Sequence, residues 1–230
     1  MGAEFDYVDL LQRFVSKVLW HFTGYGKTQP ATFEILKKII SEQTLRIAEP
    51  PEDIIMPSGE KRWTYGYSCM CDIPFKDLRI HMLRYGHYGV AFNKNDAIKA
   101  GKFNPVLYVH NDQHLFKLAD KLLQDLDRLS SPHKELEQTL LKFLGILGVY
   151  IKRGDLTAPI NVADQEIDKQ QNNNFYYERE WRSAFVWKFK KSDIEAIMVP
   201  KKSFVDLKSF LETNGFKDTP IILSEMVERL

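Results

Sequence analysis

Residues 68–92, SCMCDIPFKDLRIHMLRYGHYGVAF, predict a strand, a helix and a second strand in direct succession. Asp72 can cap the helix, Pro74 suits its first turn, and Gly86 ends it. This close alternation of strand and helix indicates a mixed α and β fold.

Further strands and helices are predicted on both sides of this stretch. Apolar runs and two-residue alternation predict strands, and an apolar period of 3.6 residues predicts helices. The strands are expected at residues 18–24, 44–49, 64–71, 87–93, 104–110, 175–189, 194–200 and 219–224; the helices at 7–15, 29–43, 72–86, 113–129, 132–151 and 201–213, with a short one after residue 93; and loops at 50–62 and 156–174. We therefore expect a single α+β domain over residues 1–230, with mixed and antiparallel sheets of short strands and flanking helices.

Residues 113–151 are expected to form a helical hairpin inserted between strands of this domain. Its first helix carries a leucine seam, and its second carries another apolar seam. The second seam consists of Leu136, Leu140, Phe143, Leu144 and Leu147.

The composition limits the classes of function. The chain has 230 residues, 44% apolar content and a formal net charge of +1, so no global field attracts it to nucleic acid or acidic lipid. No apolar run is long enough to span a membrane, and the N-terminus does not resemble a signal peptide. Together with only two cysteines, these features predict a cytoplasmic protein without a membrane partner.

Residues 68–92 contain two cysteines and two histidines, which raises the question of a metal site. A zinc site needs about four ligands at characteristic spacing, and Cys69 and Cys71 lack a second pair. We therefore expect no metal, no bond between these two cysteines, and a role for them as small apolar side chains.

The motif YYEREWR, residues 176–182, is the strongest candidate for chemistry. On a strand, Glu178 and Glu180 would lie on one face together with Arg182. The three side chains are then either paired surface charges or a catalytic group in which a carboxylate stabilises an oxocarbenium-like transition state.

Imidazole and tyrosine side chains form the second candidate group. His21 lies between Trp20 and Phe22, where it either bonds to a backbone group or points into a cleft. His81 and Tyr85 are four residues apart on one helical face, and Tyr88 starts the next strand. An ordinary helix-to-strand turn explains the glycines beside His81, Tyr85 and Tyr88, but it does not explain why aromatic and imidazole groups gather there.

The stretch CMCDIPFKDLRIHMLRYGHYGVAF, followed by NPVLYV and YYEREWR, resembles the AbiGi family of bacterial abortive-infection proteins over residues 18–200. The resemblance implies a role in phage defence in the bacterial cytoplasm, with a partner protein of the same defence system.

A weaker resemblance connects the chain with ADP-ribosyltransferases. It rests on the early histidine in HFT, the aromatic residues in mid-chain and the late Glu-x-Glu after a polar loop. It implies an ADP-ribosyltransferase-like fold and NAD as a substrate, with Glu180 catalytic and Glu178 helping a protein or nucleic-acid acceptor. The NAD-binding side chains implied by the resemblance are His21, Thr23, Ser68, His81, Tyr85, Tyr88 and Arg182.

Two hypotheses follow. In the first, the chain is an NAD-consuming toxin, either an ADP-ribosyltransferase or an NAD glycohydrolase. In the second, it is a non-enzymatic sensor or binding module, in which EREWR is a structural ion-pair network and the hairpin of residues 113–151 docks a partner. Exposed apolar surface on that hairpin would favour the second hypothesis.

Overall fold

The structure is a computed structural model, and it describes residues 16–24, 27–47, 54–55, 61–62, 66–110, 117–118, 121–122, 124–125, 134–154 and 175–229. The predicted helix at residues 7–15 and the predicted loop at 156–174 lie outside these ranges.

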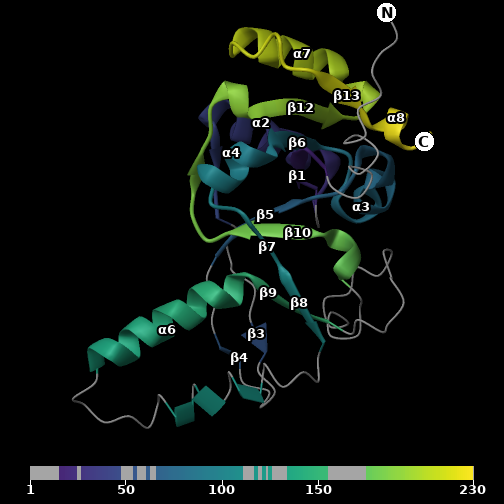
Figure 1. Cartoon of the computed structure of the whole chain (residues 1–230). Helices are drawn as coiled ribbons and strands as arrows, with labels where there is room; N and C mark the ends of the chain where they lie inside the picture. The colour runs from purple at the N-terminus through teal and green to yellow at the C-terminus, as the bar shows by residue number, and fades with distance from the viewer. Residues whose placement is uncertain are drawn as a thin grey trace, which may run out of the picture.

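A seven-stranded sheet forms the centre of the fold (Figure 1). Its strand order is β13-β12-β6-β1-β5-β10-β7, and every neighbouring pair is antiparallel except β12 with β13. The strands span Val18–Phe22 (β1), Ser68–Cys71 (β5), Gly89–Asn93 (β6), Asn104–Pro105 (β7), Glu180–Ser183 (β10), Ile194–Val199 (β12) and Ile221–Leu223 (β13).

Successive residues of a strand point to opposite faces of the sheet. Both faces carry apolar side chains, and helices cover both. Leu19 belongs to one apolar cluster with residues of α2 and α7, whereas Trp20 belongs to a second cluster with residues of α3 and α8. The helices are α2 (Gln29–Glu42), α3 (Leu78–Tyr85), α4 (Lys94–Lys99), α7 (Phe204–Thr213) and α8 (Ser224–Val227), with 3-10 turns η2 (Phe75–Asp77), η5 (Tyr176–Glu178), η6 (Lys191–Asp193) and η7 (Lys201–Ser203).

A smaller unit lies beside the β10–β7 edge of the sheet (Figure 1). Strands β8 (Leu107–His110) and β9 (Ile151–Gly154) pair in parallel, and the helix α6 (Lys134–Val149) lies between them in the chain. Two further two-stranded sheets join β2 (Thr44–Leu45) with β11 (Trp187–Lys188), and β3 (Ile54–Ile55) with β4 (Lys61–Arg62).

The structure confirms the predicted α+β class, with its mixed and antiparallel short strands and flanking helices. It also confirms the predicted helices in the regions of α2, α3, α4 and α7. Of the hairpin at residues 113–151, the second helix corresponds to α6, whereas only six positions of the first are described, all of them helical. The hairpin and the single-domain assignment therefore stay predictions.

Three local predictions are wrong. The side chain of Asp72 does not cap α3 but accepts hydrogen bonds from the Ser16 backbone N–H at 2.9 Å and from Lys94 Nζ at 2.6 Å. The predicted loop at residues 50–62 contains β3 and β4, and the single strand expected at residues 175–189 is divided into η5, β10 and β11. The short helix α8 was not predicted.

The cysteine and membrane expectations can be compared with the described part of the chain. Cys69 and Cys71 are both free thiols, as predicted, and Cys71 is buried in the second apolar cluster. Within the described ranges, no helix has both the length and the apolar character of a membrane span.

Candidate functional site

The two carboxylates of the YYEREWR motif lie in different elements. Glu178 ends the 3-10 turn η5, and Glu180 begins strand β10. Arg179 between them has a φ of 44°, in the left-handed region that residues other than glycine seldom occupy. The expected strand geometry is therefore wrong, yet this backbone turn still brings both carboxylates to one lysine, Lys152.

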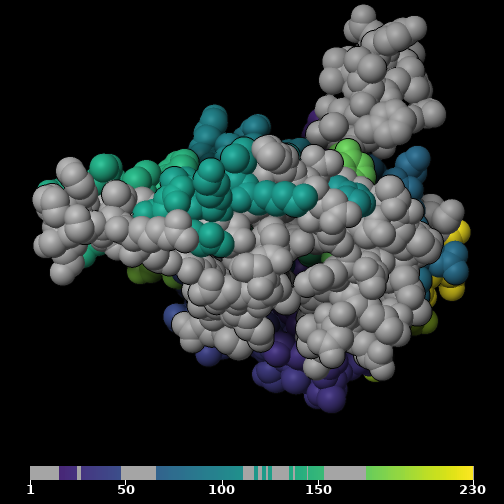
Figure 2. Space-filling view, turned by 90° about the horizontal axis from the view of Figure 1, so that it is seen from below, coloured from purple at the N-terminus to yellow at the C-terminus, as the bar shows by residue number. Residues whose placement is uncertain are grey.

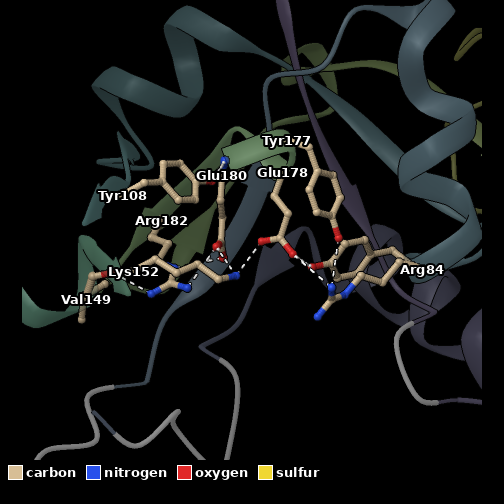
Figure 3. Close-up of polar contacts among 9 residues, drawn as sticks. Arg84, Tyr108, Val149, Lys152, Tyr177, Glu178, Glu180 and Arg182 are labelled. Atoms are coloured by element: carbon tan, nitrogen blue, oxygen red, sulfur yellow. Dashed lines mark hydrogen bonds and ion pairs between the residues drawn. The ribbon is translucent and has the colours of Figure 1, made fainter. Parts of the chain in front are cut away.

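Glu180 is buried and fully engaged by cations (Figure 3). Arg182 donates from Nε to one carboxylate oxygen at 3.0 Å and from Nη2 to the other at 3.0 Å, and Lys152 Nζ donates at 3.1 Å. Burial alone would raise the pKa of Glu180, but the charges of Arg182 and Lys152 outweigh it and hold the pKa at about 2. Glu180 is thus paired with Arg182, as one of the two alternatives held, but the pair is buried and does not lie at the surface.

Glu178 is more deeply buried, with 1% of its surface exposed. Lys152 Nζ donates to one of its oxygens at 2.5 Å, and the Tyr85 hydroxyl donates to the other at 2.7 Å. Arg84 Nη1 lies 3.8 Å from the same oxygen as Tyr85 and donates to the Tyr177 hydroxyl at 2.9 Å. Burial, together with Glu178 and Glu180, raises the pKa of Tyr85 well above 10.0, so Tyr85 remains a donor.

His81 extends this group on the helix side. Its ring stacks on Tyr85 at 4.3 Å between centroids and lies 5.2 Å from the ring of Phe22. Burial, with smaller contributions from Lys152 and Arg84, outweighs the opposing effect of Glu180 and lowers the pKa of His81 to about 3. The imidazole is therefore neutral, and its Nδ1 has no hydrogen-bond partner among the described residues.

The other predicted NAD-binding residues have contacts of their own. The His21 ring Nδ1 lies 2.7 Å from the Cys69 carbonyl oxygen, which is the backbone bond considered for it above. Thr23 Oγ1 donates to the Thr32 carbonyl oxygen at 3.2 Å, and the Tyr88 hydroxyl shares a hydrogen bond with Ser203 Oγ at 2.9 Å. Ser68 Oγ is buried without a partner in the described part of the chain.

The structure thus joins five of the predicted site residues in one network, whereas the other predicted residues have partners outside it or none among the described residues. The network contains Glu178, Glu180, Arg182, Tyr85 and His81. Sequence analysis missed Lys152, Arg84 and Tyr108. The Tyr108 hydroxyl accepts a hydrogen bond from the Glu180 backbone N–H at 2.7 Å. None of these three carries a local signal, because strand pairing and helix packing over long sequence distances bring them to the motif.

The network has three cationic side chains, Lys152, Arg182 and Arg84, around two carboxylates. Removing either carboxylate would leave buried positive charge without its partner, which is costly. Within the described ranges, no group of three or more His, Cys, Asp or Glu side chains could hold a metal ion.

A hollow of about 680 Å³ lies elsewhere, at the ends of the parallel strands β12 and β13. Its lining carries charges of both signs, from Lys201, Lys202, Glu225 and Glu228, together with His87 and Gln29. None of the predicted site residues lines it, so it gives no support to the expected NAD site.

A second candidate surface is the outer face of α6. Leu136 and Phe143 are 55% and 59% exposed, and Leu147 is also exposed. These three residues are spaced by seven and four positions, so they share one side of the helix. Leu118 and Leu122, in the described part of the preceding segment, are exposed as well. Teal atoms, the colour of the described residues between 117 and 149, lie at the surface in Figure 2.

Comparison with known protein families gives a match over most of the chain. The sequence model of a family described as "Putative abortive phage resistance protein AbiGi, antitoxin" matches residues 34–217. No curated protein and no solved structure matches, so the resemblance to ADP-ribosyltransferases has no support from the comparisons. The matched range includes α6 and the whole charged network, and it begins after His21.

Proposed function

The chain belongs to the AbiGi family of abortive phage-resistance proteins, and from this premise we propose that it is an antitoxin that binds a toxin protein through α6. The family is described as the antitoxin of such a system, and an antitoxin requires a toxin as its partner. The proposed contact surface is the apolar face formed by Leu136, Phe143 and Leu147, called the α6 face below.

The exposure of the α6 face is the observation that carries this proposal. Large apolar side chains gathered on one exposed face are typical of protein interaction sites. Each Leu or Phe that is about half exposed would contribute roughly 1 kcal/mol on complete burial. Exposed polar residues of the same helix, Glu135 and Lys142, can form a rim around the apolar centre.

The charged network supports a binding role over catalysis. A carboxylate that stabilises a cationic transition state must present its charge to the substrate. The charge of Glu180 is already engaged by Arg182 and Lys152, and Glu178 is bonded to Lys152 and Tyr85. This arrangement agrees with the hypothesis that EREWR is a structural ion-pair network.

The test compares charged substitutions on two exposed apolar surfaces. We expect Leu136→Asp and Phe143→Asp to abolish the rescue of bacteria that express the toxin of the same defence system, and to abolish binding of that tagged toxin. Leu83→Asp is the matched control, because Leu83 is 69% exposed but lies on α3. Full rescue and wild-type affinity in both α6 variants would contradict the proposal.

NAD consumption is the second candidate function. The observation that favours it is the convergence of Glu178, Glu180, Tyr85 and His81 from three separate elements. In that case the purified chain releases nicotinamide from NAD, and Glu180→Gln lowers the rate by about 100-fold or more. Glu195→Gln, an exposed glutamate on β12, is the control. No release by the wild-type chain, with or without lysate of infected cells, would reject this function.

A further inference from the structure

We propose that Arg182 and Lys152 are positioning residues that hold α6 in a fixed orientation relative to the seven-stranded sheet. The proposal rests on the proposed function, because the orientation of α6 determines how its apolar face meets the toxin. It assigns the EREWR motif to partner recognition, acting through the helix without touching the toxin.

Arg182 supplies the cation at the C-terminal end of α6. Its Nη1 donates to the Val149 carbonyl oxygen at 3.1 Å, and Val149 is the last residue of the helix. The last four carbonyl groups of a helix lack partners within it, and the helix dipole favours a positive charge there. The last turn of α6 has no basic residue of its own, so strand β10 provides one.

The guanidinium of Arg182 has a well-defined position. Glu180 accepts two of its hydrogen bonds, at 3.0 Å each, and its central carbon lies 4.0 Å from the ring centroid of Tyr67. Only 2% of the residue is exposed, so water does not compete for these contacts. A planar guanidinium that is bonded on several sides fixes the orientation of the helix end relative to β10.

Lys152 makes a second connection three residues after α6. It lies on β9 and donates to both Glu178 and Glu180, at 2.5 and 3.1 Å. Backbone hydrogen bonds reinforce this connection. The Val106 N–H donates to the Glu180 carbonyl oxygen at 2.9 Å, and the next N–H, of Leu107, donates to the Tyr150 carbonyl oxygen at 2.8 Å. Both ends of the unit that carries α6 are therefore joined to β10 by polar contacts.

Polar contacts supplement apolar packing here, because three large apolar side chains of α6 point away from the rest of the chain. Leu136, Phe143 and Leu147 face outward and cannot also hold the helix against the sheet. Of the other described apolar positions of α6, Gly145 and Val149 are buried, and Leu140, Leu141 and Ile146 are half-buried. Hydrogen-bonded charges at the end of the helix thus specify its direction while its apolar face remains available for a partner.

The test uses hydrogen exchange of the full free chain. We expect Arg182→Met to accelerate exchange of the α6 amides by about tenfold or more, because a charged hydrogen-bond partner is lost. The amides of β6 and β12 should keep wild-type protection. Arg182→Lys should give a smaller acceleration, since lysine retains the charge without the fork. Arg46→Met is the control, because Arg46 makes an exposed ion pair with Glu42.

Two outcomes would overturn the proposal. Unchanged α6 exchange in Arg182→Met and Lys152→Met would show that these residues do not hold the helix. Equal loss of protection in β6, β12 and α6 would show a general role in folding. If Arg182→Met does not fold, Arg182→Lys decides between local and general loss by the same pattern.

Toxin binding separates this proposal from the proposed function. Phe143→Asp should abolish binding and leave α6 exchange unchanged, whereas Arg182→Lys should accelerate α6 exchange and weaken binding with the α6 face intact. A wild-type chain that does not bind the toxin would reject the proposed function, while the exchange pattern would still report on positioning.

Discussion

The seven-stranded sheet and the β8–α6–β9 unit are stabilised by different kinds of contact. The sheet carries apolar clusters on both faces, with residues such as Leu19 and Phe92 completely buried. The α6 helix exposes Leu136, Phe143 and Leu147, and the junction of its unit with β10 is made by buried charges. Apolar burial thus stabilises the sheet, whereas directional polar contacts hold the unit and leave its apolar surface free for another molecule.

Phe92→Ala should have the largest effect, because it acts on the apolar side of this contrast. Phe92 is 0% exposed, and its ring lies 5.0 Å from Trp187 and 4.8 Å from Phe189. Removing it leaves a cavity, and we expect a loss of about 4 kcal/mol in the free energy of unfolding. Urea denaturation measures this loss. A change below about 1 kcal/mol would mean that the sheet core does not dominate stability.

Lys152→Met tests the charged side of the contrast. The substitution leaves Glu178 and Glu180 buried without their shared cation, which should cost about 3 kcal/mol in the free energy of unfolding. Lys38→Met is the matched control, because Lys38 makes an exposed pair with Glu42, and it should cost less than about 0.5 kcal/mol.

A second variant sharpens the interpretation of Lys152→Met. Adding Glu178→Gln removes one of the two carboxylates that accept a hydrogen bond from Lys152, so the double variant should recover part of the lost stability. No recovery would indicate that the loss comes from packing of the lysine stem.

Acid should weaken the protein through its buried histidines. The pKa values of His21 and His81 are lowered from 6.5 by burial, that of His81 to about 3. Below pH 6.5 the unfolded chain takes up the His81 proton while the folded chain does not, so stability falls by about 1.4 kcal/mol per pH unit through His81. The lowered pKa of His21 acts in the same direction. Glu180 adds to the loss below its ordinary value of 4.5, as the pH approaches its folded pKa of about 2.

His81→Phe isolates one part of this pH dependence. Phenylalanine retains an aromatic ring beside Tyr85 but cannot take up a proton in the unfolded chain. Between pH 6.5 and 4.5, the slope of unfolding free energy against pH should therefore be lower than in the wild-type chain by about 1.4 kcal/mol per pH unit. An identical slope in the two proteins would show that His81 is protonated in the folded state.

The same contrast explains what the sequence could predict. Strong periodicity predicted β1, α2 and β12, because their apolar patterns reflect burial in the sheet clusters. The pairing of Glu180 with Arg182 was predictable as well, since residues two apart share a strand face.

The remaining features depend on contacts between distant parts of the chain. The position of Glu178 depends on the left-handed Arg179, which the motif does not indicate. Lys152 comes from a strand whose place beside the network is set by long-range pairing. For α6, the apolar period predicts a helix but does not say whether its face is buried within the chain or left for a partner.

Phe143→Ala should have the smallest effect on stability and therefore completes the contrast with Phe92→Ala. Because Phe143 is 59% exposed, its truncation should change the free energy of unfolding by less than about 0.5 kcal/mol in urea denaturation. The same substitution should weaken toxin binding by about tenfold or more, since buried aromatic side chains dominate protein interfaces. A stability loss close to that of Phe92→Ala would instead place Phe143 in the chain's own core, and the α6 face would then have no surface to offer a partner.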